Sequence, residues 1–200
     1  MPQSARAAPR LKFKPKYDKI VELLLYLSRK RPGADQYQAV KFFYLADREH
    51  LNRYGRPITF EAYYALPYGP VATHALDMIR GDKAVLKKAG LNKLPIHMQQ
   101  EGKRILLLSP RREINFDVFS KSDLKVFDDI LRRYGSKTFV ELYGITHSHF
   151  AYRNAWNHRD KDKDAAPMQY EDMIMSRPIR KAGLEKEDVI KELEAIAEHM

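Results

Sequence analysis

The chain has 200 residues, contains no cysteine and carries a formal net charge of +10, from 36 Lys and Arg against 26 Asp and Glu. The lack of cysteine excludes thiol nucleophiles, disulfides, iron–sulfur clusters and cysteine-ligated zinc. An apolar fraction of 44% and an aromatic fraction of 11% exclude a disordered chain. The length favours one domain that can bury a core without disulfides.

The positive charge is unevenly distributed. Residues 1–16 contain five Lys and Arg, three prolines and no acidic residue, and we predict that they form a flexible basic arm. The longest apolar stretch, residues 20–27, is interrupted by Glu22 and is far shorter than the ~20 residues that span a bilayer. No apolar segment follows the basic N-terminus as it would in a secretory signal, so we expect a cytoplasmic protein without membrane contact.

The next segments are predicted to form two helices. Residues 17–30 are apolar on almost every face, which is typical of a helix at the centre of a core. Residues 36–54 carry an apolar stripe at helical spacing. Asp35 can cap the start of this helix and Gly55 its end.

Extended structure is predicted to follow. Residues 58–66 are rich in aromatic and β-branched side chains, which favours a strand. Residues 67–70 predict a rigid turn, and a helix over 71–80 is expected to begin close to Pro70. The basic stretch 81–93 is ambiguous and can hold a short helix.

The second half predicts a hairpin and further helices. Residues 95–99 and 104–109 predict a β-hairpin, and the continuous apolar run in its second strand is typical of a strand covered on both faces. Ser120 and Thr138 each begin a helix with the spacing of a capping box. The apolar stripe of the second of these helices extends to Phe150.

The chain is predicted to end in a charged loop, residues 158–164, and an amphipathic helix, residues 184–198. The whole pattern predicts a mainly α fold of the α+β class, a compact helical domain with a small β-hairpin or sheet. We expect three parts, namely the basic arm at 1–16, the domain at 17–157 and an extension at 158–200.

Catalytic motifs are missing. The sequence contains no phosphate-binding loop, dinucleotide fingerprint, zinc-protease helix or serine nucleophile elbow. His147 and His149 lie two positions apart and would point in different directions on a helix, so they should not share a metal. Asp47 and His50 have a spacing that could share a ligand. We expect no enzyme activity, cofactor or metal, and keep a metal enzyme built on Asp47, His50 and His147 as a lesser alternative.

Asp47 falls on the apolar stripe of its helix, where an unpaired carboxylate would be costly. Its candidate partners are backbone N–H groups and the side chains of His147, Tyr63, Tyr64 and Tyr143. We predict a buried polar network that joins residues 36–54 to the helix carrying Thr146 and His147.

Several short motifs stand in a fixed order along the chain. They are residues 41–51 (KFFYLADREHL), 54–59 (YGRPIT), Tyr63, 68–71 (YGPV), 119–124 (FSKSDL), 139–142 (FVEL), Thr146-His147 and Trp156. Together they resemble the Panacea domain, the SocA-like antitoxin domain that is also found in phage-associated proteins. Ser148 stands where that family usually has an acid, so no role of that acid is carried over.

The resemblance implies a structural network of family residues, namely Asp47, His50, Arg56, Tyr68, Gly69, Pro70, Thr146, His147 and Trp156. It also implies a helical antitoxin that neutralises a co-encoded toxin by direct binding. In the SocA branch the domain instead delivers the toxin to the ClpXP protease as an adaptor, and the residues leave both modes open.

The family's partner contacts often lie in added segments, which here places them in residues 170–200. The candidate contact residues are Tyr170, Met173, Ile174, Leu184, Ile190 and Leu193. The alternative function is a nucleic-acid-binding regulator in which the basic arm and residues 83–93 contact phosphate. The toxin, its target and the oligomeric state are not readable from the residues.

Overall fold

The computed structural model describes residues 9–176 and 185–199. The helices are α1 (Tyr17–Lys30), α2 (Gln36–Tyr54), α3 (Thr73–Arg80), α4 (Lys83–Lys88), α5 (Lys121–Tyr134), α6 (Phe139–His147), α7 (Phe150–Asn157) and α8 (Lys186–Glu198), with short 3₁₀ turns at η1 (Phe116–Val118) and η2 (Tyr170–Asp172). The strands are β1 (Ala34–Asp35), β2 (Tyr63–Leu66), β3 (Gly69–Ala72), β4 (Ile96–Glu101), β5 (Arg104–Pro110) and β6 (Ala166–Pro167). The mainly α prediction is confirmed.

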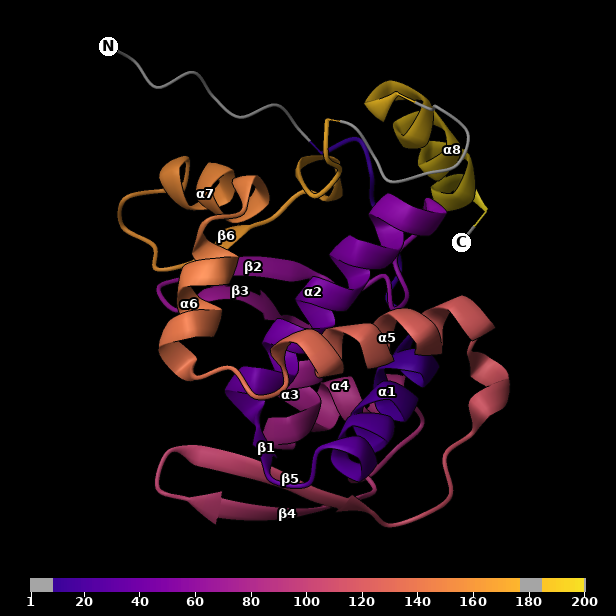
Figure 1. Cartoon of the computed structure of the whole chain (residues 1–200), viewed down its shortest axis with the longest axis vertical. Helices are drawn as coiled ribbons and strands as arrows, with labels where there is room; N and C mark the ends of the chain where they lie inside the picture. Colours follow the sequence, from indigo (N-terminus) through magenta and orange to yellow (C-terminus); the bar gives the residue numbers. More distant parts are fainter. Residues whose placement is uncertain (1–8, 177–184, 200) are drawn as a thin grey trace.

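Helix α2 lies at the centre of the molecule, with α1, α3 and α5 below it and α6 and α7 to one side (Figure 1). Two small antiparallel sheets flank this bundle among the described residues, in the orders β1-β5-β4 and β3-β2-β6. The second sheet carries the β2–β3 hairpin, in which Tyr64 pairs with Val71 and Leu66 with Gly69.

The predicted helix boundaries hold where capping chemistry defines them. The side chain of Asp35 accepts the backbone N–H of Gln38 at the start of α2, and Gly55 ends the helix with φ of 78°. Capping boxes at Ser120 and Thr138 begin α5 and α6 as predicted.

The predicted strand 58–66 is shorter than expected, because only its last four residues pair in β2. The backbone N–H groups of Ile58 and Thr59 donate to the carboxylate of Asp47. Phe60 has a φ of 53°, which breaks the extended backbone. The first residues of the predicted strand therefore do not pair in the sheet, because Asp47 binds the N–H groups of Ile58 and Thr59 and the backbone bends at Phe60.

The helix predicted over 71–80 begins later, at Thr73, because Val71 and Ala72 complete β3. Pro70 also belongs to this strand, which is tolerated because β3 lies at the edge of its sheet. The buried carboxylate of Glu61 caps α3 from outside by accepting the N–H groups of His74 and Ala75.

Two other expectations are wrong. The predicted helix that reaches Phe150 is broken, because α6 ends at His147 and α7 starts at Phe150. The strand β5 is not covered on both faces, because Leu107 is buried while its apolar neighbours Leu106 and Leu108 keep part of their surface exposed. The β4–β5 hairpin lies at the lower rim of the molecule (Figure 1).

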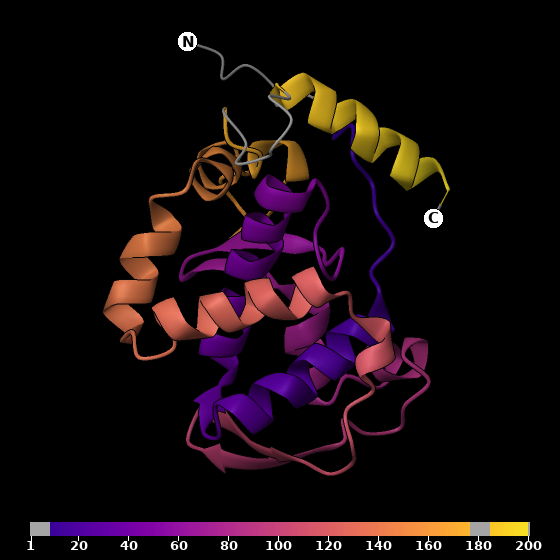
Figure 2. The ribbon, with the colours of Figure 1, turned by 45° about the vertical axis from the view of Figure 1, so that its right-hand side comes forward.

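Residues 9–16 differ from the predicted flexible arm because they carry apolar side chains into the core. Leu11 is 4% exposed, and the Phe13 ring packs edge-to-face on Phe60 at 5.0 Å and on Tyr170 at 5.1 Å. Arg10 pairs with Glu194 at 2.8 Å and so connects this segment to α8. Figure 2 shows the segment running from α1 to α8. Residues 1–8 lie outside the described residues.

Described residues after 164 also contribute to the core. Strand β6 pairs with β2, and the Tyr170 hydroxyl donates to the Glu61 carbonyl at 2.8 Å. The side-chain amide of Asn52, on α2, donates to the Met173 carbonyl at 2.9 Å. The predicted charged loop at 158–164 is present. In the described residues, none of the helices combines the length and hydropathy that crossing a bilayer requires.

Candidate functional site

Helix α2 buries polar side chains on several of its faces. Lys41, Asp47, His50 and Asn52 are all buried among aromatic and aliphatic neighbours. Buried polar groups need hydrogen-bond partners, because leaving one unpaired costs about 1–3 kcal/mol and more for a charge. Each of these side chains finds its partner on a different neighbouring segment, and the site is built from these contacts.

Asp47 anchors the segment that leads into β2. Its carboxylate accepts the N–H of Ile58 at 2.8 Å, the N–H and hydroxyl of Thr59, and the hydroxyl of Tyr63 at 2.8 Å. Burial raises the pKa of Asp47, and the four donors oppose that shift. The predicted burial, the tyrosine partner and the backbone N–H partners are present, but the predicted link to the helix of Thr146 and His147 is wrong.

His50 and Arg56 meet at Asp123, on α5. Nε2 of His50 lies 3.1 Å from one carboxylate oxygen of Asp123, and Arg56 donates to the same oxygen at 2.8 Å. Lys19, on α1, donates to the other oxygen at 2.6 Å. Burial alone would raise the pKa of Asp123, but the hydrogen bonds from His50 and Lys19 hold it well below its usual range. This node ties α1, α2 and α5 together.

Lys41 supports the β2–β3 hairpin from below. Lys41 is 0% exposed. Its ammonium group donates to the carbonyl of Pro70 at 2.8 Å and lies 4.8 Å from the centre of the Tyr37 ring. Burial lowers the pKa of Lys41 to about 7. The ammonium group therefore has two partners, the Pro70 carbonyl and the face of the Tyr37 ring. Both lie close to the turn at Gly69.

Gly69 allows the hairpin to approach these side chains. Its φ is 97°, and a Cβ added there would lie 2.8 Å from Nζ of Lys41 and 3.0 Å from the Thr146 hydroxyl and the His147 ring. Only glycine combines this backbone conformation with this close approach. Thr146 donates its hydroxyl to the Leu142 carbonyl, within α6. The turn is thus enclosed between α2 and α6.

His147 connects the turn to an array of aromatic rings. Its ring stacks on Tyr143 at 3.6 Å and lies 4.2 Å from Tyr152. Nδ1 lies 2.8 Å from the Tyr143 carbonyl and Nε2 lies 3.3 Å from the Pro67 carbonyl. Burial lowers the pKa of His147, and a neutral imidazole can donate to only one of these carbonyls.

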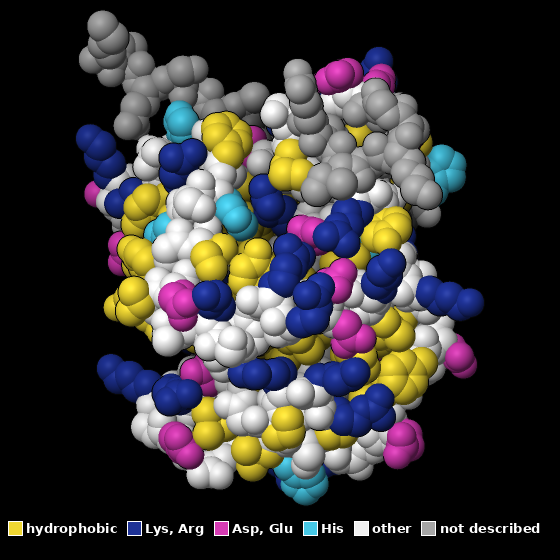
Figure 3. Space-filling view, viewed as in Figure 1, with side chains coloured by type: hydrophobic (Ala, Val, Ile, Leu, Met, Phe, Trp, Pro, Cys, Tyr) yellow, Lys and Arg dark blue, Asp and Glu magenta, His cyan; other side chains and the backbone are white. Residues whose placement is uncertain are grey.

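Aromatic side chains around the turn are exposed to solvent. Tyr68 is 64% exposed, Phe139 48% and Tyr143 38%, and Val140 beside them is 75% exposed. The ring of Phe139 packs on two tyrosine rings, with its centre 4.3 Å from that of Tyr37 and 6.0 Å from that of Tyr68. We call Tyr68, Phe139, Val140 and Tyr143 the aromatic surface. Figure 3 shows hydrophobic side chains gathered along the left of the molecule, over α6.

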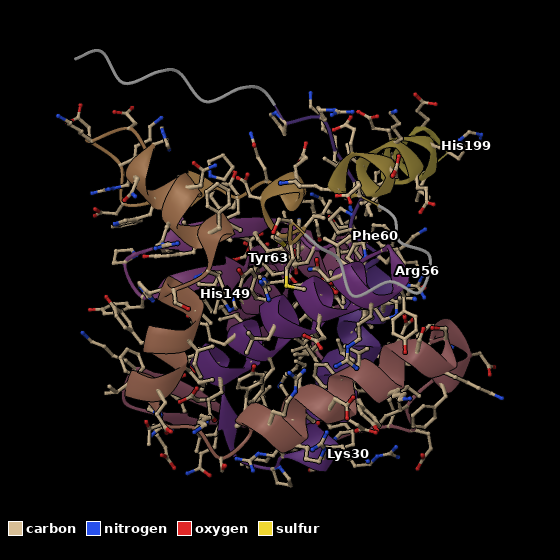
Figure 4. The ribbon with its side chains drawn as sticks, turned by 45° about the horizontal axis from the view of Figure 1, so that its top comes forward. Lys30, Arg56, Phe60, Tyr63, His149 and His199 are labelled. Atoms are coloured by element: carbon tan, nitrogen blue, oxygen red, sulfur yellow. The ribbon has the colours of Figure 1, made fainter. Side chains whose placement is uncertain are left out.

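Trp156 is connected to Tyr143 of this surface through the rings of Tyr152 and His147. It is partly buried, stacks on Tyr152 with the ring planes 11° apart, and is covered by the Arg159 guanidinium at 3.9 Å. His149, at the start of α7, contacts α2 instead, with its Nδ1 3.2 Å from the Tyr44 hydroxyl. Figure 4 labels His149 and Tyr63, which approach α2 from α7 and β2. His147 and His149 therefore diverge. In the described ranges, we find no cluster of three His, Asp or Glu suited to a metal.

The structure thus divides the family residues into two groups. One group lies at the turn and on α6 and α7, and it comprises Tyr68, Gly69, Pro70, Thr146, His147 and Trp156. In the other group, Asp47 anchors the segment before β2, whereas His50 and Arg56 meet at Asp123. Sequence reasoning gave no role to Lys41, Tyr37 or Phe139. The signal for Lys41 was present, since a lysine within the run VKFFYLA of a buried helix requires a partner.

The C-terminal contact residues predicted from the sequence are placed elsewhere. Tyr170, Met173, Ile174, Ile190 and Leu193 are buried in the core, and Leu184 lies outside the described residues. The Tyr170 ring packs on Phe13 and on Tyr63, and the other four belong to the same buried cluster. This burial argues against the predicted partner contact, because a side chain without exposed surface cannot meet a partner in this conformation.

We predict that Gly69→Ala destabilises the protein by about 3 kcal/mol, because the new Cβ meets Lys41 and α6 and the φ becomes strained. Gly33→Ala is the matched control, since Gly33 has a φ of 86° with nothing within 4 Å of the added Cβ, and should cost about 1 kcal/mol. Urea denaturation measures both. Equal losses would show that the turn is not enclosed as described.

We also predict that the protein gains stability from pH 7 to pH 9 relative to Lys41→Met. In the unfolded chain Lys41 keeps its proton up to about 10.5, whereas in the folded chain burial lowers its pKa to about 7. The unfolded state therefore binds more protons between these values, so stability rises with pH. The difference in unfolding free energy between the two proteins should grow by about 2 kcal/mol in favour of the wild type. A difference that is constant with pH would contradict the lowering of the Lys41 pKa by burial.

A comparison with protein families supports the motif analysis. The family model described as "Antitoxin SocA-like, Panacea domain" matches residues 40–157, a range that contains most of α2, the β2–β3 hairpin, α6 and α7. No curated protein and no solved structure matches the chain. The chain belongs to the SocA-like antitoxin family of Panacea domains.

Proposed function

We propose that this protein is a cytoplasmic antitoxin that neutralises a co-encoded toxin by binding it directly. The observation that supports this most strongly is the aromatic surface, where three aromatic rings and a valine are exposed side by side on a rigid support. Tyrosine and phenylalanine are enriched in the cores of protein interfaces, where they supply large contact areas at a low entropic cost.

The support beneath the surface favours binding over catalysis. Lys41 connects the hairpin to α2 through the Pro70 carbonyl, and His147 connects it to α6 through the Pro67 carbonyl. A preformed surface loses little conformational freedom on association, which increases affinity. A standard interface buries about 800 Å² on each partner, so residues around the four that define the aromatic surface would also contact the toxin. We propose no enzymatic step for this site.

Masking of the toxin is the mode that we propose. Delivery of the toxin to the ClpXP protease, as in the SocA branch, is the competing mode and needs a second docking surface for the protease. The two modes differ in the fate of the toxin, because masking leaves its amount unchanged whereas delivery lowers it in a manner that requires the protease.

We predict that the double variant Tyr68→Ala/Phe139→Ala loses neutralisation. Removal of two central aromatic anchors should weaken toxin binding by about 30-fold or more. The assay co-expresses the variant with the toxic product of the neighbouring reading frame and measures cell survival and toxin level. Both side chains are largely exposed, so the variant should keep its fold, which circular dichroism checks.

The matched control is the double variant Tyr54→Ala/Phe116→Ala, which removes two exposed aromatic rings at other places. It should protect cells as the wild type does. Protection by the Tyr68/Phe139 variant that equals the control would contradict the assignment of the toxin-binding surface.

A further inference from the structure

A second surface differs from the first in its chemistry. The segment from the end of α3 to the loop after α4 exposes five cations, Arg80, Lys83, Lys87, Lys88 and Lys93. We call these five residues the basic segment. None of them forms an ion pair or a side-chain hydrogen bond with the residues that the structure describes.

Several cations elsewhere in the described residues are paired with acids, in contrast to the five of the basic segment. Elsewhere in the fold, five cations form ion pairs with a carboxylate within 4 Å, namely Lys19, Arg53, Arg56, Arg104 and Arg112. The one acid inside the basic segment, Asp82, uses its carboxylate to cap α4 by accepting the N–H of Val85. Asp82 offsets one of the five charges, so the segment still presents an excess of positive charge to solvent.

The fold holds the basic segment in place. Val85 and Leu86 on α4 are buried in the core, which turns Lys83, Lys87 and Lys88 outward. Gly81, with φ of 81°, ends α3 and directs the chain into α4. Figure 1 shows α4 beside α3 and apart from α6 and α7, so the basic segment and the aromatic surface lie in different places.

The chemistry of the segment selects the kind of partner. None of its residues is a large exposed hydrophobic side chain, so the segment offers no anchor for a protein interface and none to insert into a membrane. It contains no aromatic ring on which unpaired bases could stack. What remains is attraction to closely spaced phosphates, which a nucleic-acid duplex presents along its backbone.

We propose that the basic segment binds the phosphate backbone of double-stranded DNA without sequence preference. This activity is separate from toxin binding and does not depend on it. In the N-terminal arm, Arg10 is already paired with Glu187 and Glu194.

The test uses the full-length protein and a fluorescein-labelled DNA duplex of about 20 base pairs and arbitrary sequence, followed by fluorescence anisotropy. Five phosphate contacts predict a slope of log K against log salt of about −4.5, which is a loss of about 500-fold in affinity from about 50 to about 200 mM salt. The triple variant Lys83→Gln/Lys87→Gln/Lys88→Gln should reduce the slope to about −2.

The control variant Lys121→Gln/Lys125→Gln/Lys161→Gln removes the same charge from exposed positions elsewhere and should bind the duplex as the wild type does. Equal weakening in both triple variants would overturn the proposal, because it would trace binding to net charge alone. So would retention on phosphatidylserine vesicles with no duplex binding, or a preference for single strands. The variant of the basic segment should still neutralise the toxin, so failure of either proposal is visible separately.

Discussion

The buried polar side chains of α2 determine how the rest of the chain is arranged. A helix buried on nearly every face can carry a lysine, an aspartate and a histidine only if each meets a partner, because an unpaired buried charge costs several kcal/mol. Asp47 meets the Ile58–Tyr63 segment, Lys41 meets Pro70, and His50 meets Asp123. These contacts lie far apart along the chain, and together they fix the hairpin and α5 relative to α2.

The consequence for function is that exposed rings stand on a rigid base. The β2–β3 hairpin is short and would be marginally stable alone, but Lys41 from α2 and Thr146 and His147 from α6 enclose its turn. Tyr68 can then stay exposed without the loop folding onto the core. The basic segment on α3 and α4 is held by apolar burial instead of by polar contacts. Val85 and Leu86 of α4 are buried, whereas the five cations are exposed.

Much of the fold was predictable because local chemistry specifies it. Asp35, Gly55, Ser120 and Thr138 define helix ends through contacts within a few residues. The incorrect predictions concern segments whose conformation depends on contacts between residues far apart in the sequence. The strand 58–66 is shortened by Asp47, and residues 9–16 are ordered by Phe60 and Tyr170. At the site, the motif order identified Gly69 and His147, but the exposure of Phe139 depends on where α6 lies and could not be read from its apolar stripe.

The account depends most on Asp47, whose role is tested directly by amide hydrogen exchange in Asp47→Ala and Asp47→Asn. Alanine leaves the donors of Ile58, Thr59 and Tyr63 without a partner, whereas asparagine keeps one acceptor oxygen for the N–H groups of Ile58 and Thr59. We expect faster exchange in Asp47→Ala from residue 58 through the β2–β3 hairpin, near-normal exchange there in Asp47→Asn, and no change in α4. Unchanged exchange in the hairpin of Asp47→Ala would contradict the claim that α2 holds the site in place.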